Sequence, residues 1–183
     1  IFLWECMALT PSYVRILQRH WVRDDISTIT NTFPDHEDLQ GPAGVNIPQV
    51  MTNFIAEGGL LLTTEEQMQP ILEHAATELH TPISGVGWLE AGLLTPDVLA
   101  RFPYDEHPFN IALVIRLGEE LGLAPYFAFK HIADRAVPDL FLLKTFHIAP
   151  VDSIKLKLVN GMSATESVGR MSNWGRVAFD QLD

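Results

Sequence analysis

Apolar residues recur at helical spacing along most of this chain, and several of these segments open with a proline. Thr10-Pro11, Thr95-Pro96 and Val137-Pro138 are examples. Proline suits the first turn of a helix, because the backbone N–H that it lacks has no partner there, and a preceding threonine can cap the helix. The pattern predicts helices over 11–23, 25–33, 48–57, 65–79, 96–102, 108–122, 125–135, 138–147, 151–159, 164–171 and 174–182.

Sustained alternation of apolar and polar residues, the mark of a half-buried strand, is scarce. Leu60-Leu61-Leu62, which follows two glycines, and the segment 83–88 could form one short pair. The sequence therefore predicts an all-α fold of short, orthogonally packed helices, with at most a minor two-stranded element.

The chain of 183 residues is long enough for one domain with a sizeable core. We expect a single helical domain over 1–183. The segment 34–48, rich in proline, glycine and acidic residues, is a candidate linker after an N-terminal helical pair at 1–33.

The segment 108–122 is apolar on nearly every helical face, which is typical of a helix at the centre of a core. We expect Val114 to be buried there. Four phenylalanines that follow are expected to pack around this helix: Phe127, Phe129, Phe141 and Phe146.

Composition adds that the chain is apolar for a soluble protein, with 47% hydrophobic residues, 19% charged residues and a mean hydropathy of +0.12. Either the core is well filled or a partner covers apolar surface, so a protein partner or self-association is expected.

No apolar run reaches the ~18 residues of a membrane-spanning helix. The lone Cys6 excludes an intramolecular disulfide and favours a cytoplasmic location. Because the chain begins at Ile1, residues are expected to be missing upstream.

The formal charge of −11 is uneven. Residues 61–125 hold ten acidic and two basic residues, whereas 126–183 hold six acidic and seven basic ones. The acidic first two thirds would repel nucleic acid and the last third would not.

The C-terminal segment 151–182 resembles the tri-helical helix-turn-helix of bacterial regulators and recombinases. A helix at 152–159, a turn at 160–162 and a capped helix from Ser163 would precede a third helix at 174–182. The resemblance implies DNA contact through the basic side chains of Lys155, Lys157, Arg170 and Arg176. Three residues depart from the pattern: Asn173 in the turn, and Gly175 and Asp180 in the reading helix.

No residue pattern assigns catalytic chemistry. His74 and Glu78 have the i, i+4 spacing of a shared metal ion, but a further ligand pair does not appear, so no metal site is predicted. Ser84-Gly85-Val86-Gly87 lacks the glycine spacing of a nucleophile elbow or a dinucleotide loop. We expect no cofactor, and catalytic residues stay unassigned.

Three functional classes remain. The first is a helical protein-interaction or regulatory module, part of a larger chain or complex, with Trp174 and Phe179 as protein-contact anchors. The second is a DNA-associated regulator that uses residues 151–182. The third is a helical enzyme whose scattered acidic and histidine residues converge only in the fold.

Overall fold

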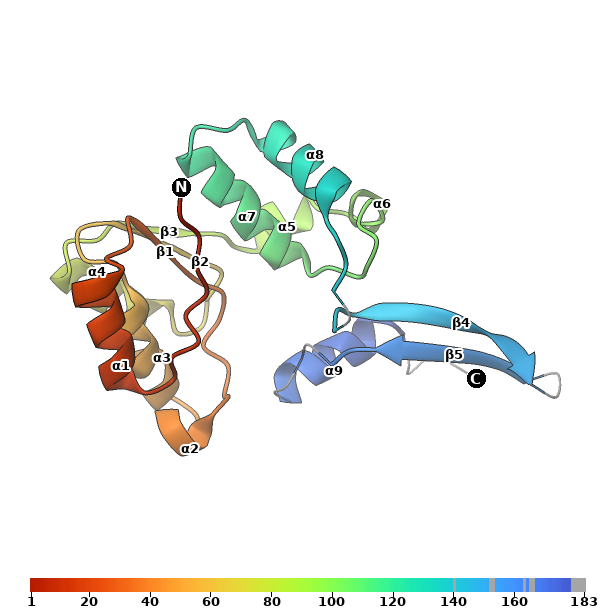
Figure 1. Cartoon of the computed structure of the whole chain (residues 1–183), viewed down its shortest axis with the longest axis horizontal. Helices are drawn as coiled ribbons and strands as arrows, with labels where there is room; N and C mark the ends of the chain where they lie inside the picture. The colour runs from red at the N-terminus through yellow and green to blue at the C-terminus, as the bar shows by residue number, and fades with distance from the viewer. Residues whose placement is uncertain (140, 152–153, 163, 165–166, 179–183) are drawn as a thin grey trace.

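The computed structural model describes residues 1–139, 141–151, 154–162, 164 and 167–178, and the side chains of residues 151 and 154–156 lie outside this description. Figure 1 shows three groups of elements: a parallel sheet with helices α1–α4, a group of helices α5–α8, and a β-hairpin with helix α9. The all-α prediction is wrong, because the chain is a mixed α/β protein with a three-stranded and a two-stranded sheet.

The first sheet consists of β1 (Ile26–Ile29), β2 (Leu60–Thr63) and β3 (Ile83–Gly85), all parallel and in the order β1-β2-β3. Parallel neighbours need crossover connections. Between β1 and β2 the chain forms α2 (Glu37–Gln40), α3 (Asn46–Met51) and a 3₁₀ turn (Thr52–Phe54), and between β2 and β3 it forms α4 (Gln69–Glu78). The expected pairing of residues 60–62 with 83–88 is confirmed, as a parallel pair.

The central strand β2 is apolar because both of its faces are covered. Leu61 packs with Ile29, Ile55, Leu72 and Ala76 on the face that α4 covers. Leu62 packs with Val86, Ala112 and Leu113 on the other face, which α7 (Pro108–Glu120) covers.

The helical group contains α5 (Trp88–Gly92), α6 (Pro96–Leu99), α7 and α8 (Pro125–Arg135). Helices α7 and α8 approach closely at Gly118, where an added Cβ would lie 3.0 Å from that of Ala128. Val114 is 42% exposed, so α7 is not buried on all faces as the sequence suggested. Of the four phenylalanines expected around it, only Phe129 is buried, whereas Phe127, Phe141 and Phe146 are exposed.

The C-terminal elements correct four predicted helices, of which two are strands and two fall within one helix. β4 (Lys144–Val151) and β5 (Ile154–Asn160) form an antiparallel hairpin where helices at 138–147 and 151–159 were predicted. Cross-strand pairing of Phe146 with Leu158 stabilises strands instead. α9 (Ser167–Arg176) then runs without a break through the turn expected at residues 172–173. The helix-turn-helix prediction is therefore wrong, since its first helix is a strand.

At the N-terminus, α1 (Pro11–Ile16) continues as a π-helical turn (Leu17–Trp21), which confirms the first predicted helix. The second member of the predicted helical pair is wrong, because 25–33 contains β1. Its β-branched residues Ile26, Thr28 and Ile29 favour the extended backbone. The helices predicted from residues 48, 65, 96, 108 and 125 onward are confirmed with shifted ends as α3 with its 3₁₀ turn, α4, α6, α7 and α8.

Candidate functional site

The carboxyl ends of β1, β2 and β3 meet at one edge of the parallel sheet, which we call the carboxyl edge. Open α/β sheets bind ligands outside this edge, because the loops that leave the strands converge there. The three loops here are residues 30–36, 64–68 and 86–87, the last of which leads directly into Trp88 at the start of α5.

The first two loops are joined by a buried carboxylate. Glu65, only 6% exposed, accepts hydrogen bonds at Oε2 from the backbone N–H of Thr32 (2.7 Å) and from its hydroxyl (2.9 Å). Its other oxygen, Oε1, accepts from the N–H of Met68 (2.9 Å). Thr63 supports the same junction, since its hydroxyl donates to the carbonyl of Ile29 (2.7 Å).

The second and third loops are joined by the next residue. Glu66 Oε1 accepts a hydrogen bond from the backbone N–H of Trp88 at 3.2 Å. This carboxylate lies against Gly87, where an added Cβ would stand 3.0 Å from it, so glycine allows the close approach. Trp88 is 73% exposed and meets the ring of Phe109 edge-on at 5.0 Å between centroids.

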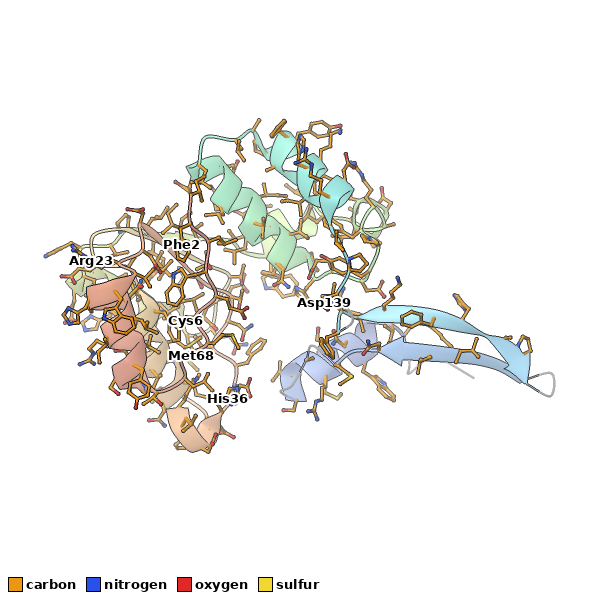
Figure 2. All side chains as sticks on the ribbon, viewed as in Figure 1. Phe2, Cys6, Arg23, His36, Met68 and Asp139 are labelled. Atoms are coloured by element: carbon orange, nitrogen blue, oxygen red, sulfur yellow. The ribbon has the colours of Figure 1, made fainter. Side chains whose placement is uncertain are left out.

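The loop after β1 contains a residue in an unfavourable conformation. His36 has a φ of +48°, in the left-handed region that residues with a side chain rarely adopt. Its N–H donates to Asp35 Oδ1 (2.9 Å), and its Nε2 lies 3.7 Å from Asp35 Oδ2. Figure 2 labels His36 and, on the same part of the molecule, Met68. Arg23 and His80, which precede β1 and β3 at the opposite edge, have a similar φ, so this conformation does not by itself mark a site.

The carboxyl edge thus offers exposed hydroxyl, carboxylate and amide groups, on Thr30, Glu66 and Gln67, together with the exposed indole ring of Trp88. Such groups accept hydrogen bonds from a ligand and provide a flat apolar surface for it. Within the described residues, no three histidine, cysteine or acidic side chains gather closely enough to hold a metal ion.

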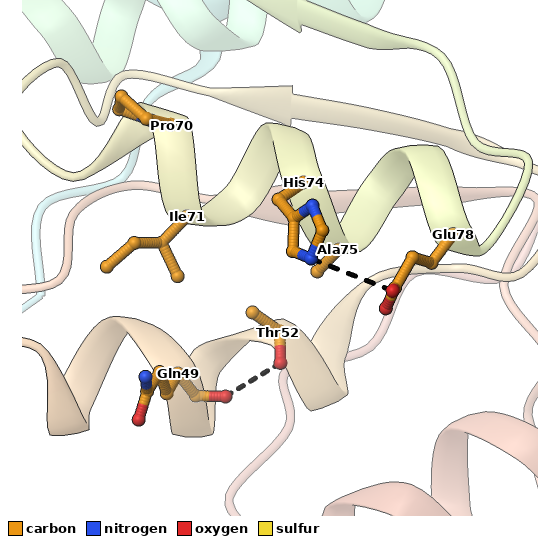
Figure 3. Close-up of a pocket in the computed structure, with 7 residues that line it drawn as sticks. All are labelled: Gln49, Thr52, Pro70, Ile71, His74, Ala75 and Glu78. Atoms are coloured by element: carbon orange, nitrogen blue, oxygen red, sulfur yellow. Dashed lines mark hydrogen bonds and ion pairs between the residues drawn. The ribbon is translucent and has the colours of Figure 1, made fainter.

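A groove lies between α3 and α4 (Figure 3). This open groove of about 420 Å³ is lined by Gln49, Thr52, Pro70, Ile71, His74, Ala75 and Glu78. His74 and Glu78 do form the pair that their spacing suggested, with 3.6 Å between Nε2 and Oε1. Their side chains are 79% and 70% exposed, so this is a surface ion pair, charged only when the histidine is protonated.

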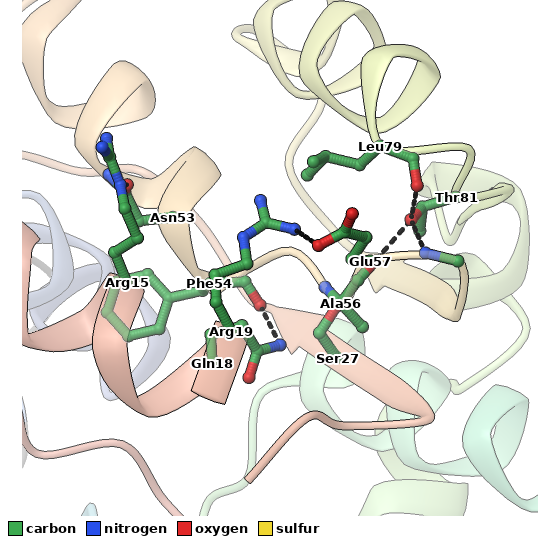
Figure 4. A network of polar contacts seen from close by, with 11 residues as sticks. Arg15, Gln18, Arg19, Ser27, Asn53, Phe54, Ala56, Glu57, Leu79 and Thr81 are labelled. Carbon is green, nitrogen blue, oxygen red and sulfur yellow. Dashed lines mark hydrogen bonds and ion pairs between the residues drawn. The ribbon is translucent and has the colours of Figure 1, made fainter. Parts of the chain in front are cut away.

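The opposite end of the sheet, the amino edge, contains a polar network of a different kind (Figure 4). The hydroxyl of Ser27 accepts from the N–H of Ala56 (3.1 Å), and that of Thr81 accepts from Gly58 (3.2 Å) and donates to the carbonyl of Ala56. Gln18 donates to the carbonyl of Phe54 at 3.0 Å. These side chains satisfy the chain's own backbone.

The residues that the sequence singled out lie elsewhere, in the C-terminal elements. Lys157 Nζ donates to the carbonyl of Val177 (3.4 Å), Arg170 Nε to that of Ala164 (3.3 Å) and Arg176 Nη2 to that of Glu106 (2.7 Å). Arg170 and Trp174 line a small hollow between α9 and the hairpin. Phe179 and the side chain of Lys155 lie outside the described residues. Protein contact through Trp174 and Phe179 stays a prediction.

Arg176 reaches the start of α7 beside His107, the residue that caps this helix by accepting from the N–H of Phe109 at 3.4 Å. Burial lowers the pKa of His107, and the neighbouring Arg176 lowers it further, against the opposing effect of Glu106. Burial likewise lowers the pKa of Arg176, although Asp105 and Glu106 favour its charge.

Sequence reasoning missed the carboxyl edge. Thr32 lies 33 residues before Glu65 in the chain, and the two meet only because β1 and β2 are parallel neighbours. One signal was available: polar residues follow directly after the apolar run Leu60-Leu61-Leu62.

Comparison with known proteins finds two related bacterial sequences. The chain is 29% identical over 174 residues to "PGA synthase CapB" of Bacillus subtilis (strain 168), and 27% identical over 173 residues to "Capsule biosynthesis protein CapB" of Bacillus anthracis. Each match covers 94% of this chain but only 43% and 36% of the respective relative, so the chain spans less than half the length of either. No family model matches the chain, and no solved structure does.

These relatives correct the functional prediction. Both are named for biosynthesis and neither for regulation, which contradicts a protein-interaction or regulatory module and a DNA-associated regulator. In the described part of the chain, no helix is long and apolar enough to cross a membrane.

Proposed function

We propose that this chain is part of an enzyme of capsule biosynthesis, of the synthase type for which its Bacillus subtilis relative is named. The proposal rests on the extent of the match. Each match covers 94% of the chain, so the parallel sheet must lie largely within it. We extend this proposal to the activity, substrates and partners of a whole synthase. We also propose the cytoplasmic location that the lone Cys6 favours.

The carboxyl edge is the part of the chain that suits this function best. A synthase must hold its reactants in a fixed arrangement, because orientation supplies much of the rate enhancement. Three loops converge at this edge and are fixed to one another by Glu65 and Glu66. We therefore assign substrate contact to the solvent-accessible groups beside these two residues, among them the exposed Trp88 and the half-buried Thr64, whose hydroxyl donates to the carbonyl of Thr30.

The test is genetic. Deleting the coding sequence in the organism that carries it should reduce surface capsule at least tenfold, as measured by quantifying capsular polymer per cell. The wild-type gene supplied on a plasmid should restore the capsule. A deletion strain with an unchanged amount of capsule would contradict the proposal.

A further inference from the structure

We infer that Glu65 is a positioning residue, whose buried carboxylate fixes the loop after β1 against the start of α4 and thereby sets the geometry of the carboxyl edge. The geometric part of this inference stands on the contacts alone. Its consequence for catalysis rests on the proposed function.

The first support is the energetic cost of the arrangement. Burying a carboxylate is expensive unless hydrogen bonds replace the lost water. Glu65 is almost fully buried, and three hydrogen-bond donors offset this cost: the N–H and hydroxyl of Thr32 and the N–H of Met68. Because charge-assisted hydrogen bonds are stronger than neutral ones, the carboxylate holds both segments firmly.

The second support is the place of its partners. Thr32 lies in the loop after β1, whereas Met68 immediately precedes α4, a ten-residue helix. A negative charge at the start of a helix is favoured by the positive end of the helix dipole. Glu65 therefore joins the start of α4 to a loop that is 33 residues away in sequence.

The third support is what the loop contains. His36, four residues beyond Thr32, keeps its left-handed conformation, and such strain persists only where the surroundings determine the backbone. The loop has local bonds of its own, from Phe33 N–H to Asn31 (3.1 Å) and from His36 N–H to Asp35 (2.9 Å). Glu65 is the buried side chain that joins this loop to the end of β2, beside the bond from the Thr64 hydroxyl to the carbonyl of Thr30.

The neighbour of Glu65 extends the same device to the other side. β1 and β3 flank β2 on opposite sides, and Glu66 accepts from Trp88, the first residue of α5 after the loop that follows β3. Two consecutive glutamates after the central strand thus tie the loops on both sides to it. Only Glu65 is buried, so its loss should be the more disruptive.

Glu65→Gln is a sharp test, because glutamine has the same shape but one oxygen and one NH₂ group. All three partners of Glu65 are donors, so either orientation of the amide places an NH₂ group against an N–H. Glu78→Gln is the matched control, since Glu78 lies at the other end of α4 with a 70% exposed side chain. Thr32→Val removes only the hydroxyl donor, and Thr32→Ser retains it.

The measurement is amide hydrogen exchange of the purified full chain, followed by mass spectrometry. We expect Glu65→Gln to accelerate exchange in residues 30–36 and at Met68 at least tenfold, with little change in α7 and α8. Thr32→Val should show a smaller effect on the same segments, and Thr32→Ser and Glu78→Gln should resemble wild type. Unchanged exchange in residues 30–36, or equal acceleration throughout the chain, would overturn the inference.

A second arm separates this inference from the proposed function. In the deletion strain, Glu65→Gln at wild-type protein level should restore less capsule than Glu78→Gln does, and Thr32→Ser should restore more than Thr32→Val. If the deletion strain keeps its capsule, the proposed function fails, and the exchange data alone decide the role of Glu65. If exchange changes as expected but both glutamine variants restore capsule equally, the catalytic consequence is overturned.

Discussion

The two edges of the parallel sheet are both polar, but their hydrogen bonds serve different ends. At the amino edge, Ser27, Thr81 and Gln18 bond to backbone groups of Ala56, Gly58 and Phe54. These bonds close the ends of strands and turns, which would otherwise bury unpaired N–H and C=O groups. The amino edge therefore has a structural role, although the buried Oε1 of Gln18 is left without a hydrogen-bond partner.

At the carboxyl edge, the buried bonds link one loop to another, and further polar groups beside them remain exposed. Glu65 and Glu66 hold the loops after β1 and β3, while Trp88 extends into solvent. The comparison teaches that polarity does not by itself mark a site. A candidate site has polar groups left over once the fold has been satisfied.

The largest expected effect comes from the strand that both edges share. Leu61 is fully buried between α4 and the sheet, so Leu61→Ala should lower the free energy of unfolding by about 3 kcal/mol. Urea denaturation measures this loss, and hydrogen exchange should show both edges losing protection together. A loss below about 1 kcal/mol would show that β2 is not the central strand of the core.

The next effect tests the hydrogen bonds to the backbone at the amino edge. Thr81→Val keeps the shape but leaves the buried carbonyl of Ala56 without this donor, which should cost about 2 kcal/mol. The exposed Thr28 on β1 provides the control, because Thr28→Val should change stability by less than about 0.5 kcal/mol. Equal losses of stability from the two substitutions in urea denaturation would show that the buried hydroxyl of Thr81 matters no more than the exposed hydroxyl of Thr28.

Sequence patterns located most helices and the pairing of β2 with β3, but not β1, which completes the sheet. Proline-initiated helices such as α7 and α8 were predictable, because proline and apolar spacing act locally. β1 was missed because four residues are too few to show alternation against an apparent helical period. The hairpin was missed because its stability depends on pairs such as Phe146 with Leu158, which join distant positions.

The candidate site was less predictable than the fold. Thr32 and Glu65 become partners only through the parallel register that pairs Ile29 with Thr63. The sequence drew attention to Arg176 as a contact for a partner, whereas in the structure it donates to the carbonyl of Glu106 within its own chain. Local patterns reveal elements, and tertiary pairing decides which side chains meet.

A smaller effect on stability, with a larger one on function, should come from the exposed groups of the carboxyl edge. Thr64→Val combined with Glu66→Ala removes bonds whose partners water can reach, so we expect a loss of about 0.5 kcal/mol for each. Capsule per cell in the complemented deletion strain should nevertheless fall severalfold. Full restoration of the capsule by this double variant would contradict the assignment of the carboxyl edge to substrate contact.

The smallest expected effect is a pH dependence that arises outside both edges. Burial and the nearby Arg176 hold the pKa of His107 below its usual value of about 6.5. The unfolded chain therefore binds more protons as the pH falls below that value, so stability is fully present above about pH 6.5 and declines as the pH falls through the folded pKa. His107→Asn keeps a residue that can cap α7 but removes the titrating ring, so its stability should decline less between pH 7 and pH 5.5. Urea midpoints across this range measure the difference between the two proteins. Identical slopes would show that His107 does not titrate differently in the folded state.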